Sequence, residues 1–264
     1  MKLFVFFLAA LSVVTVNAIE YNGKEFSKNV HDVLAPNSNT KDQSVVASVK
    51  KYLDSVEPKT DSQKRSVIKF KVWVYDQTKG SDTSFEGLSK YRDELIAKEK
   101  FEVAPTEAQK LEMLDIWYKA YKSTDKDYAV KMYEAIKATT NGHKFSNAGF
   151  YAYQTNNYLD AYNFYMENQV FPERCVEIAI KNLKDNKKVL DAAQIITKKN
   201  YDAKKVKPIV DCVINNLTTS DSVDQNEVKL FLQKVNKRYS RLMKEDEATW
   251  APIIGDVRMT LAAY

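Results

Sequence analysis

Apolar side chains recur at intervals of three and four residues along most of this chain, and that interval is typical of an amphipathic helix. Between residues 42 and 56, for example, Val45, Val46, Val49 and Leu53 fall on one side of a helix. We therefore expect an all-α fold. The same periodicity predicts helices over residues 24–34, 42–56, 60–77, 85–98, 105–122, 127–138, 145–154, 158–168, 173–183, 187–198, 202–217, 223–243 and 247–263.

One segment is ambiguous on its pattern alone. Residues 70–75 (Phe-Lys-Val-Trp-Val-Tyr) are rich in β-branched and aromatic side chains, which favours a strand. Val67, Phe70 and Val74 also fit a helical stripe, and the sequence offers no partner strand. We therefore predict that this segment belongs to the helix over 60–77.

The predicted helices are short, and short linkers join them, which favours stacked helical hairpins. Only six glycines and six prolines occur in 264 residues, too few for a turn-rich β-sandwich or barrel. A weak internal period accompanies this pattern, because Ala129, Ala161 and Ala192 lie 32 and 31 residues apart in similar apolar surroundings. A period of this length is typical of a helical-hairpin solenoid.

Residues 144–172 combine large aromatic residues, small residues and a closing proline, namely Phe145, Ala148, Gly149, Tyr158, Ala161, Tyr165 and Pro172. With these residues the stretch resembles one tetratricopeptide repeat. Asn156 replaces the usual turn glycine, and Ala152 stands where an aromatic residue is commoner. The resemblance implies a right-handed superhelix of stacked hairpins, with a concave face that binds peptides or protein partners and without cofactor or catalysis. We expect an N-terminal helical region over 19–104 and a repeat-like array over 105–264.

The first eighteen residues have the pattern of a secretory signal peptide. Lys2 supplies a positive charge, residues 3–16 are apolar, and Val16-Asn17-Ala18 is a small-residue cleavage site. The apolar run is short for a membrane span, and no second candidate span follows. We therefore expect a secreted protein.

Secretion bears on the two cysteines, Cys175 and Cys212. An even pair in an oxidising compartment most simply forms one disulfide, and two buried free thiols are the alternative. In a tetratricopeptide-like array both cysteines would lie on first helices of successive hairpins, which are neighbours. Asn216, in Asn216-Leu217-Thr218, is a candidate glycosylation site.

Catalytic and metal-binding motifs are missing from the sequence. The chain has two histidines and no zinc-ligand spacing, nucleophile elbow or phosphate-binding loop, so we expect no metal and no cofactor. Glu112, Asp115 and Asp160 lie on aromatic-rich helices and leave a carboxylate-based hydrolase open as an alternative. The other interpretation is that these carboxylates belong to the solvated faces of amphipathic helices.

Charge gives little direction about partners. The formal net charge of +5 arises from 40 basic and 35 acidic residues, which is not the footprint of a dedicated nucleic-acid binder. Lysine pairs at 187–188, 198–199 and 204–205 fall at predicted helix ends, where exposed cations keep the surface soluble. The alternative is that these lysines form a binding patch for a heparin-like polysaccharide or for nucleic acid.

Sixteen tyrosines make the composition distinctive, and many lie between residues 150 and 165. They predict either tight packing between helices or an aromatic binding face. Our hypothesis is a secreted, non-enzymatic helical repeat protein, monomeric or weakly associating, that binds a protein or peptide partner. An extracellular structural or storage protein and a carrier of an apolar small molecule are alternatives. The candidate partner-binding residues are Tyr151, Tyr153, Tyr158, Tyr162 and Tyr165.

Overall fold

The computed structural model describes residues 19–31, 43–78, 82–116 and 126–264 of the chain. The signal-peptide prediction for 1–18 and the part of the predicted 105–122 helix that follows residue 116 lie outside these residues. The chain divides into two compact units, Met1–Leu114 and Asp115–Tyr264. Within the described residues the fold is all-α apart from one short parallel pairing of Ile19–Glu20 with Val56–Glu57, which confirms the predicted fold class at that level.

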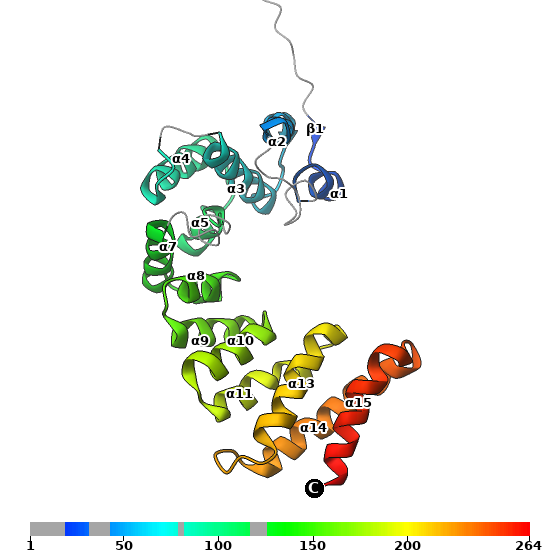
Figure 1. The fold of residues 1–264 in the computed structure, drawn as a ribbon. Helices are drawn as coiled ribbons and strands as arrows, with labels where there is room; N and C mark the ends of the chain where they lie inside the picture. The colour runs from blue at the N-terminus through cyan, green and yellow to red at the C-terminus, as the bar shows by residue number, and fades with distance from the viewer. Residues whose placement is uncertain (1–18, 32–42, 79–81, 117–125) are drawn as a thin grey trace, which may run out of the picture. The chain divides into compact units, whose positions relative to one another are not determined.

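The first unit packs α2, α3, α4 and α5 around a core of aliphatic side chains that includes Val49, Val72 and Leu88. The short parallel pair β1–β2 ties the start of the described chain to the end of α2. Helix α3 packs against α2, α4 and α5, so it is the central helix of this unit (Figure 1). The elements are β1 (Ile19–Glu20), α1 (Gly23–Phe26), η1 (Ser27–His31), α2 (Gln43–Ser55), β2 (Val56–Glu57), α3 (Asp61–Gln77), α4 (Phe85–Lys98) and α5 (Glu107–Met113).

Helix α3 confirms that residues 70–75 are helical. A capping box starts it, because the Gln63 amide donates to the Thr60 hydroxyl at 3.3 Å and the Gln63 side chain accepts from the Thr60 amide at 3.0 Å. Val67, Ile68 and Val72 then turn toward the core. The apolar β-branched residues of this segment therefore pack between helices, and burial overrides their intrinsic preference for strands.

Helix α5 begins as predicted and ends earlier. The capping box of Thr106 and Gln109 is present, with both bonds at 3.0–3.3 Å. The helix stops at Met113, and α5 packs against α3 inside the first unit. The predicted boundary at residue 105 had assigned this helix to the second region, whereas the compact units divide after Leu114.

The second unit is a consecutive stack. Helix α8 packs on α9, α9 on α10, α10 on both α11 and α13, α12 on α14, and α13 on α15 (Figure 1). Its elements are α7 (Lys126–Ala138), η2 (Gly142–Lys144), α8 (Ala148–Gln154), α9 (Tyr158–Asn168), α10 (Pro172–Ile178), η3 (Ala179–Leu183), α11 (Asn186–Ala193), α12 (Ile195–Lys198), α13 (Ala203–Leu217), α14 (Gln225–Tyr239), η4 (Leu242–Lys244) and α15 (Glu247–Ala262).

Three predicted helices of this unit are interrupted. The 173–183 helix changes to π geometry at Ala179, the 187–198 helix breaks at Gln194, and the 223–243 helix ends at Tyr239 before a 3₁₀ turn. Periodicity does not reveal such changes, because a π or 3₁₀ turn shifts the face of a helix without interrupting its apolar content.

Small residues let the two helices of the α8–α9 hairpin pack closely. A Cβ atom on Gly149 would lie only 2.6 Å from the Tyr165 ring, so the absence of a side chain lets α8 approach α9 closely. Asn156, in the turn between the two helices, has φ of 62°, a left-handed conformation that asparagine tolerates better than most residues. Ala148 and Ala161 are fully buried in the same hairpin.

Candidate partner-binding site

The structure separates the five candidate tyrosines into two groups. Tyr151, Tyr162 and Tyr165 are buried, with at most 5% of each side chain exposed, and Tyr153 and Tyr158 are half-buried. The prediction that all five form a binding face is therefore wrong for three of them. Packing between consecutive helices covers those three rings, as the alternative interpretation had it.

Two of the buried rings have fixed hydroxyl groups. Tyr151 donates to Asp115 Oδ1 at 3.0 Å, and Tyr162 donates to the backbone oxygen of Lys188 at 3.0 Å. Burial is the main cause that raises the pKa of both phenols, so they stay neutral hydrogen-bond donors. Tyr151 ties α8 to residue Asp115 after α5, Tyr162 ties α9 to α11, and neither ring offers a surface to a partner.

Tyr153 and Tyr158 are half-buried at the surface and contact each other, and Tyr153 also contacts Arg174. The two rings meet edge to face with 5.6 Å between their centroids, one at the end of α8 and the other at the start of α9. The Arg174 guanidinium of α10 lies 4.9 Å from the centre of the Tyr153 ring. Its Nη1 atom also contacts Glu177 at 2.8 Å, which orients it over the ring. This stack joins α8 to α10 across α9.

Phe171 is a further candidate that the periodicity does not reveal. Its side chain is 49% exposed in the linker between α9 and α10. Its backbone has φ of 49° and ψ of 58°, a left-handed conformation that bulky side chains seldom adopt. The residue also precedes Pro172, and a residue before proline favours extended backbone. An apolar residue directly before a helix-initiating proline was the available signal.

Tyr165 connects Phe171 with the Tyr153–Arg174 stack. The Phe171 ring packs edge to face on Tyr165, with 5.9 Å between centroids. Burial raises the pKa of Tyr165, the nearby positive charge of Arg174 opposes that rise, and Tyr153 adds to it. The Tyr165 phenol therefore lies close to both Arg174 and Tyr153. We call Tyr153, Tyr158, Phe171 and Arg174 the aromatic cluster, and buried Tyr165 supports it from the interior.

Polar groups border the aromatic cluster on the α10 side. One carboxylate oxygen of Glu173, Oε2, is buried and has no hydrogen bond within the described residues. The Tyr201 hydroxyl donates to the backbone oxygen of Gln169 at 3.3 Å. The pKa of Tyr201 is raised by burial first and by the negative charge of Glu173 second, so this carboxylate lies near the ring. A buried acceptor without a donor is uncommon in native proteins.

The predicted disulfide is not formed, and both cysteines are free. Cys175 is fully buried on α10. On α13 the buried face is centred near Val206, Val210 and Val213, and at roughly 100° per residue Cys212 lies about 120° from that centre. Cys212 therefore lies at the edge of the buried face of α13, and no bond joins it to Cys175 although α10 and α13 pack together.

The thiols give a direct chemical prediction. Burial raises the pKa of Cys175 to about 12 and raises that of the half-buried Cys212 less. Iodoacetamide at neutral pH should therefore add one alkyl group to the native protein, at Cys212, and a second at Cys175 only after unfolding. Intact mass and peptide mapping without reductant would measure this. An unfolded sample that takes up no alkyl group would reveal a disulfide.

Asn216 is exposed in the last turn of α13, the helix end at which a glycan was expected. Its side-chain nitrogen donates to the Cys212 backbone oxygen at 2.9 Å, and the Thr218 hydroxyl donates to Ile214 at 2.7 Å. Attachment of a glycan at Asn216 stays a prediction.

The carboxylates of the hydrolase alternative lie in separate surroundings. Buried Asp115 accepts from Asn147 at 2.5 Å as well as from Tyr151. Asp160 accepts from Tyr133 at 2.6 Å and from Lys137 at 2.8 Å. The hydrogen bonds from Lys137 and Tyr133 lower the pKa of Asp160. Burial is the main cause that raises the pKa of Tyr133 to about 12, and its hydrogen bond to Asp160 is the second. These pairs support structure, and Glu112 is exposed.

Metal ligands and membrane spans were also sought within the described residues. There, no three His, Cys, Asp or Glu side chains gather as a metal site. No helix in that part of the chain combines the length and the apolar character needed to cross a bilayer.

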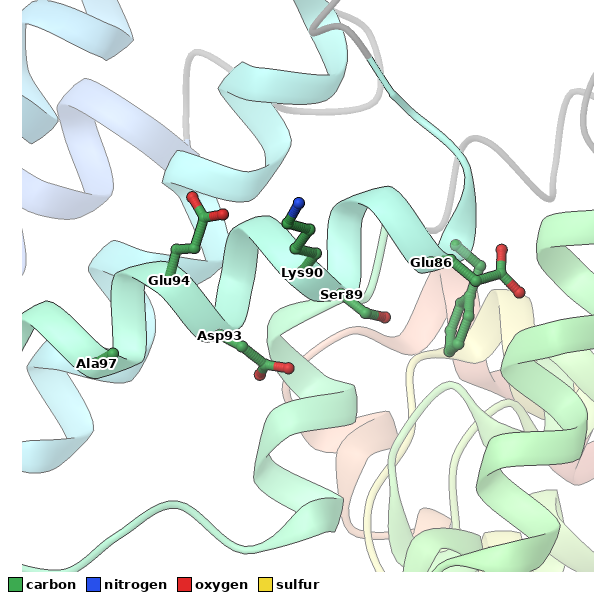
Figure 2. A pocket seen from close by; sticks show the side chains of 7 residues that line it. Glu86, Ser89, Lys90, Asp93, Glu94 and Ala97 are labelled. Atoms are coloured by element: carbon green, nitrogen blue, oxygen red, sulfur yellow. The ribbon is translucent and has the colours of Figure 1, made fainter.

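A hollow of about 640 Å³ runs along α4 in the first unit. Figure 2 shows Lys90 and Glu94 on one side of this helix and Ser89 and Asp93 on the other. Its polar groups therefore diverge, so the hollow does not form a site with converging functional groups.

Comparison of the chain with protein-family models, with curated protein sequences and with solved structures found no match. The function is therefore argued from the aromatic cluster itself.

Proposed function

We propose that this chain is a secreted, non-enzymatic helical repeat protein whose second unit binds a protein or peptide partner through the aromatic cluster. The observation that carries the proposal is Phe171. It is held half-exposed in a left-handed conformation, beside an arginine stacked on a tyrosine. Tyrosine, phenylalanine and arginine are the side chains enriched where proteins bind one another.

Strain at an exposed aromatic residue has a physical meaning. A bulky residue in the left-handed region costs on the order of 1 kcal/mol or more, and persists only where its surroundings hold it. Here the ring contact with Tyr165 and the start of α10 at Pro172 hold it. A glycine at this position would fold at lower cost, so the ring is best explained by what it contacts outside the chain.

The stacking order of the second unit supports a tetratricopeptide-like arrangement. Helix α10 packs on α13 and α12 packs on α14, so alternate helices contact one another as first and second helices of successive hairpins do. In such arrays the first helices line the concave face. Tyr153 at the end of α8 and Arg174 at the start of α10 are then neighbours on that face.

Phe171→Gly tests the proposal because it separates binding from stability. Loss of the ring contact and relief of the backbone strain oppose each other, so the midpoint of thermal unfolding should change by less than about 3 °C. Binding to the partner should weaken by at least roughly tenfold, because the ring is the exposed anchor. The partner is first captured on the immobilised wild-type protein from the source fluid, then purified and titrated against each variant.

Leu230→Ala is the matched control, since Leu230 is 48% exposed on α14, away from the cluster. It should leave the affinity unchanged. Arg174→Ala should weaken binding in the same direction as Phe171→Gly. Equal affinities for the Phe171→Gly, Arg174→Ala and Leu230→Ala variants would contradict the proposal.

A further inference from the structure

The corner between α12 and α13 concentrates positive charge. Lys198 and Lys199 end α12, and Lys204 and Lys205 begin α13. Only four residues, 199–202, join the two helices, so Lys199 and Lys204 are separated by at most about 18 Å of extended chain. Arg238, from the end of α14, reaches the same corner. We call Lys198, Lys199, Lys204, Lys205 and Arg238 the basic corner.

Hydrogen bonds fix the backbone of the basic corner. Arg238 donates to Asn200 Oδ1 at 3.1 Å and to the Lys198 backbone oxygen at 3.2 Å. The buried Tyr239 hydroxyl donates to the Ile196 backbone oxygen at 2.8 Å and accepts from the Tyr201 amide at 3.3 Å. The corner is therefore positioned before any ligand arrives, which lowers the ordering cost of binding.

Within the described residues, the four lysines of the basic corner form no ion pair. Other lysines of the same unit do, since Lys181, Lys188 and Lys207 each contact a carboxylate within 3.3 Å. The one carboxylate in the loop, Asp202, accepts from the Lys205 backbone amide as the N-cap of α13. Asp202 in the loop and Glu173 near Tyr201 offset part of the mutual repulsion of these cations, and the rest is left for an external anion.

We propose that the basic corner binds a linear sulfated polysaccharide. Several closely spaced cations on a fixed backbone suit a polymer that carries repeated negative charges, and the predicted secretion would expose the corner to such polymers. Single-stranded nucleic acid would need an aromatic face for stacking. Tyr201 is the aromatic residue of the loop, but it already has partners within the chain. Lys199 lies 5.2 Å from its ring centre, and its hydroxyl donates to the backbone oxygen of Gln169.

The glycan predicted at Asn216 on α13 would not obstruct the basic corner. Asn216 lies thirteen residues after Ala203 in the same helix, which places it about 20 Å from the basic corner. A glycan there and a polysaccharide at the corner would occupy opposite ends of α13.

The test measures binding of the full mature chain to heparin by surface plasmon resonance at several salt concentrations. Lys198→Gln, Lys199→Gln, Lys204→Gln and Lys205→Gln are combined in one variant. Its affinity should fall roughly tenfold or more at about 0.1 M salt, with a shallower dependence of log Kd on log salt concentration. Hyaluronan, which has carboxylates but no sulfates, should bind the wild-type protein far more weakly.

A charge-matched control carries Lys51→Gln, Lys90→Gln, Lys98→Gln and Lys100→Gln, which are exposed positions of the first unit. It should retain wild-type affinity for heparin. Equal losses in the two variants would assign the effect to net charge and overturn the proposal. A single-stranded oligonucleotide that binds as tightly as heparin, with the same dependence on the basic corner, would overturn the choice of ligand. Circular dichroism would check that both variants fold.

Discussion

Gly149→Ala should destabilise the second unit by about 2 kcal/mol, although alanine favours helices by up to about 1 kcal/mol over glycine. The new Cβ would lie 2.6–2.8 Å from three carbon atoms of the Tyr165 ring. That ring is 3% exposed and packs against Phe171, so it cannot move aside without opening the α8–α9 hairpin. Urea unfolding of the full chain would measure the loss as a lower midpoint.

Gly255→Ala is the matched control for this substitution. Gly255 also lies within a helix, α15, but nothing lies within 4 Å of the position that its Cβ would occupy. The change should therefore stabilise the protein by about 0.5–1 kcal/mol. The two glycine variants should shift the unfolding midpoint in opposite directions. A shift of the same sign and size would mean that the close approach of α8 to α9 is not what Gly149 provides.

Asp115→Ala should cost about 2–4 kcal/mol of unfolding free energy, the largest effect expected of any substitution considered. The side chain of Tyr151 is completely buried, and its hydroxyl would lose the acceptor that now lies 3.0 Å away. Asn147 would lose its 2.5 Å bond to the same carboxylate. A buried donor without an acceptor costs about 1–3 kcal/mol, and a bond to an ionised group is stronger than a neutral one.

Asp160→Ala is the comparison that tests this reasoning. Asp160 also accepts from a tyrosine hydroxyl, but its side chain is 27% exposed and that of its partner Lys137 is 51% exposed. Water can replace the lost bonds there, so the cost should stay below about 1 kcal/mol. Thermal and urea unfolding of both variants would show the contrast. Equal costs would mean that burial of the Asp115 cluster does not govern its contribution.

These stability experiments also bear on function. Tyr151 and Asp115 are well-connected core groups, so their loss should weaken partner binding only as far as it unfolds the second unit. Phe171 lies at the surface, and its replacement by glycine should weaken binding without that loss of stability. The contrast distinguishes a residue that holds the cluster in place from one that contacts the partner.

Local sequence determined the helices and most of their ends. The helices predicted over 85–98 and 158–168 have the same bounds in the structure, and the capping box at Thr106 is present. Periodicity and capping act within a few neighbouring residues, so they can be read without knowing what a helix packs against. The small residues of the α8–α9 hairpin were recognisable for the same reason, since Gly149 and Ala161 mark a close approach whatever the partner.

Tertiary structure alone decided which aromatic residues are buried. Tyr151 and Tyr153 stand two residues apart on one short helix, yet the first is fully buried and the second is half-exposed. The difference depends on where α9 and α10 lie, which no local pattern encodes. The same holds for the left-handed backbone of Phe171 and for the free cysteines, because each depends on the angle at which one helix meets the next.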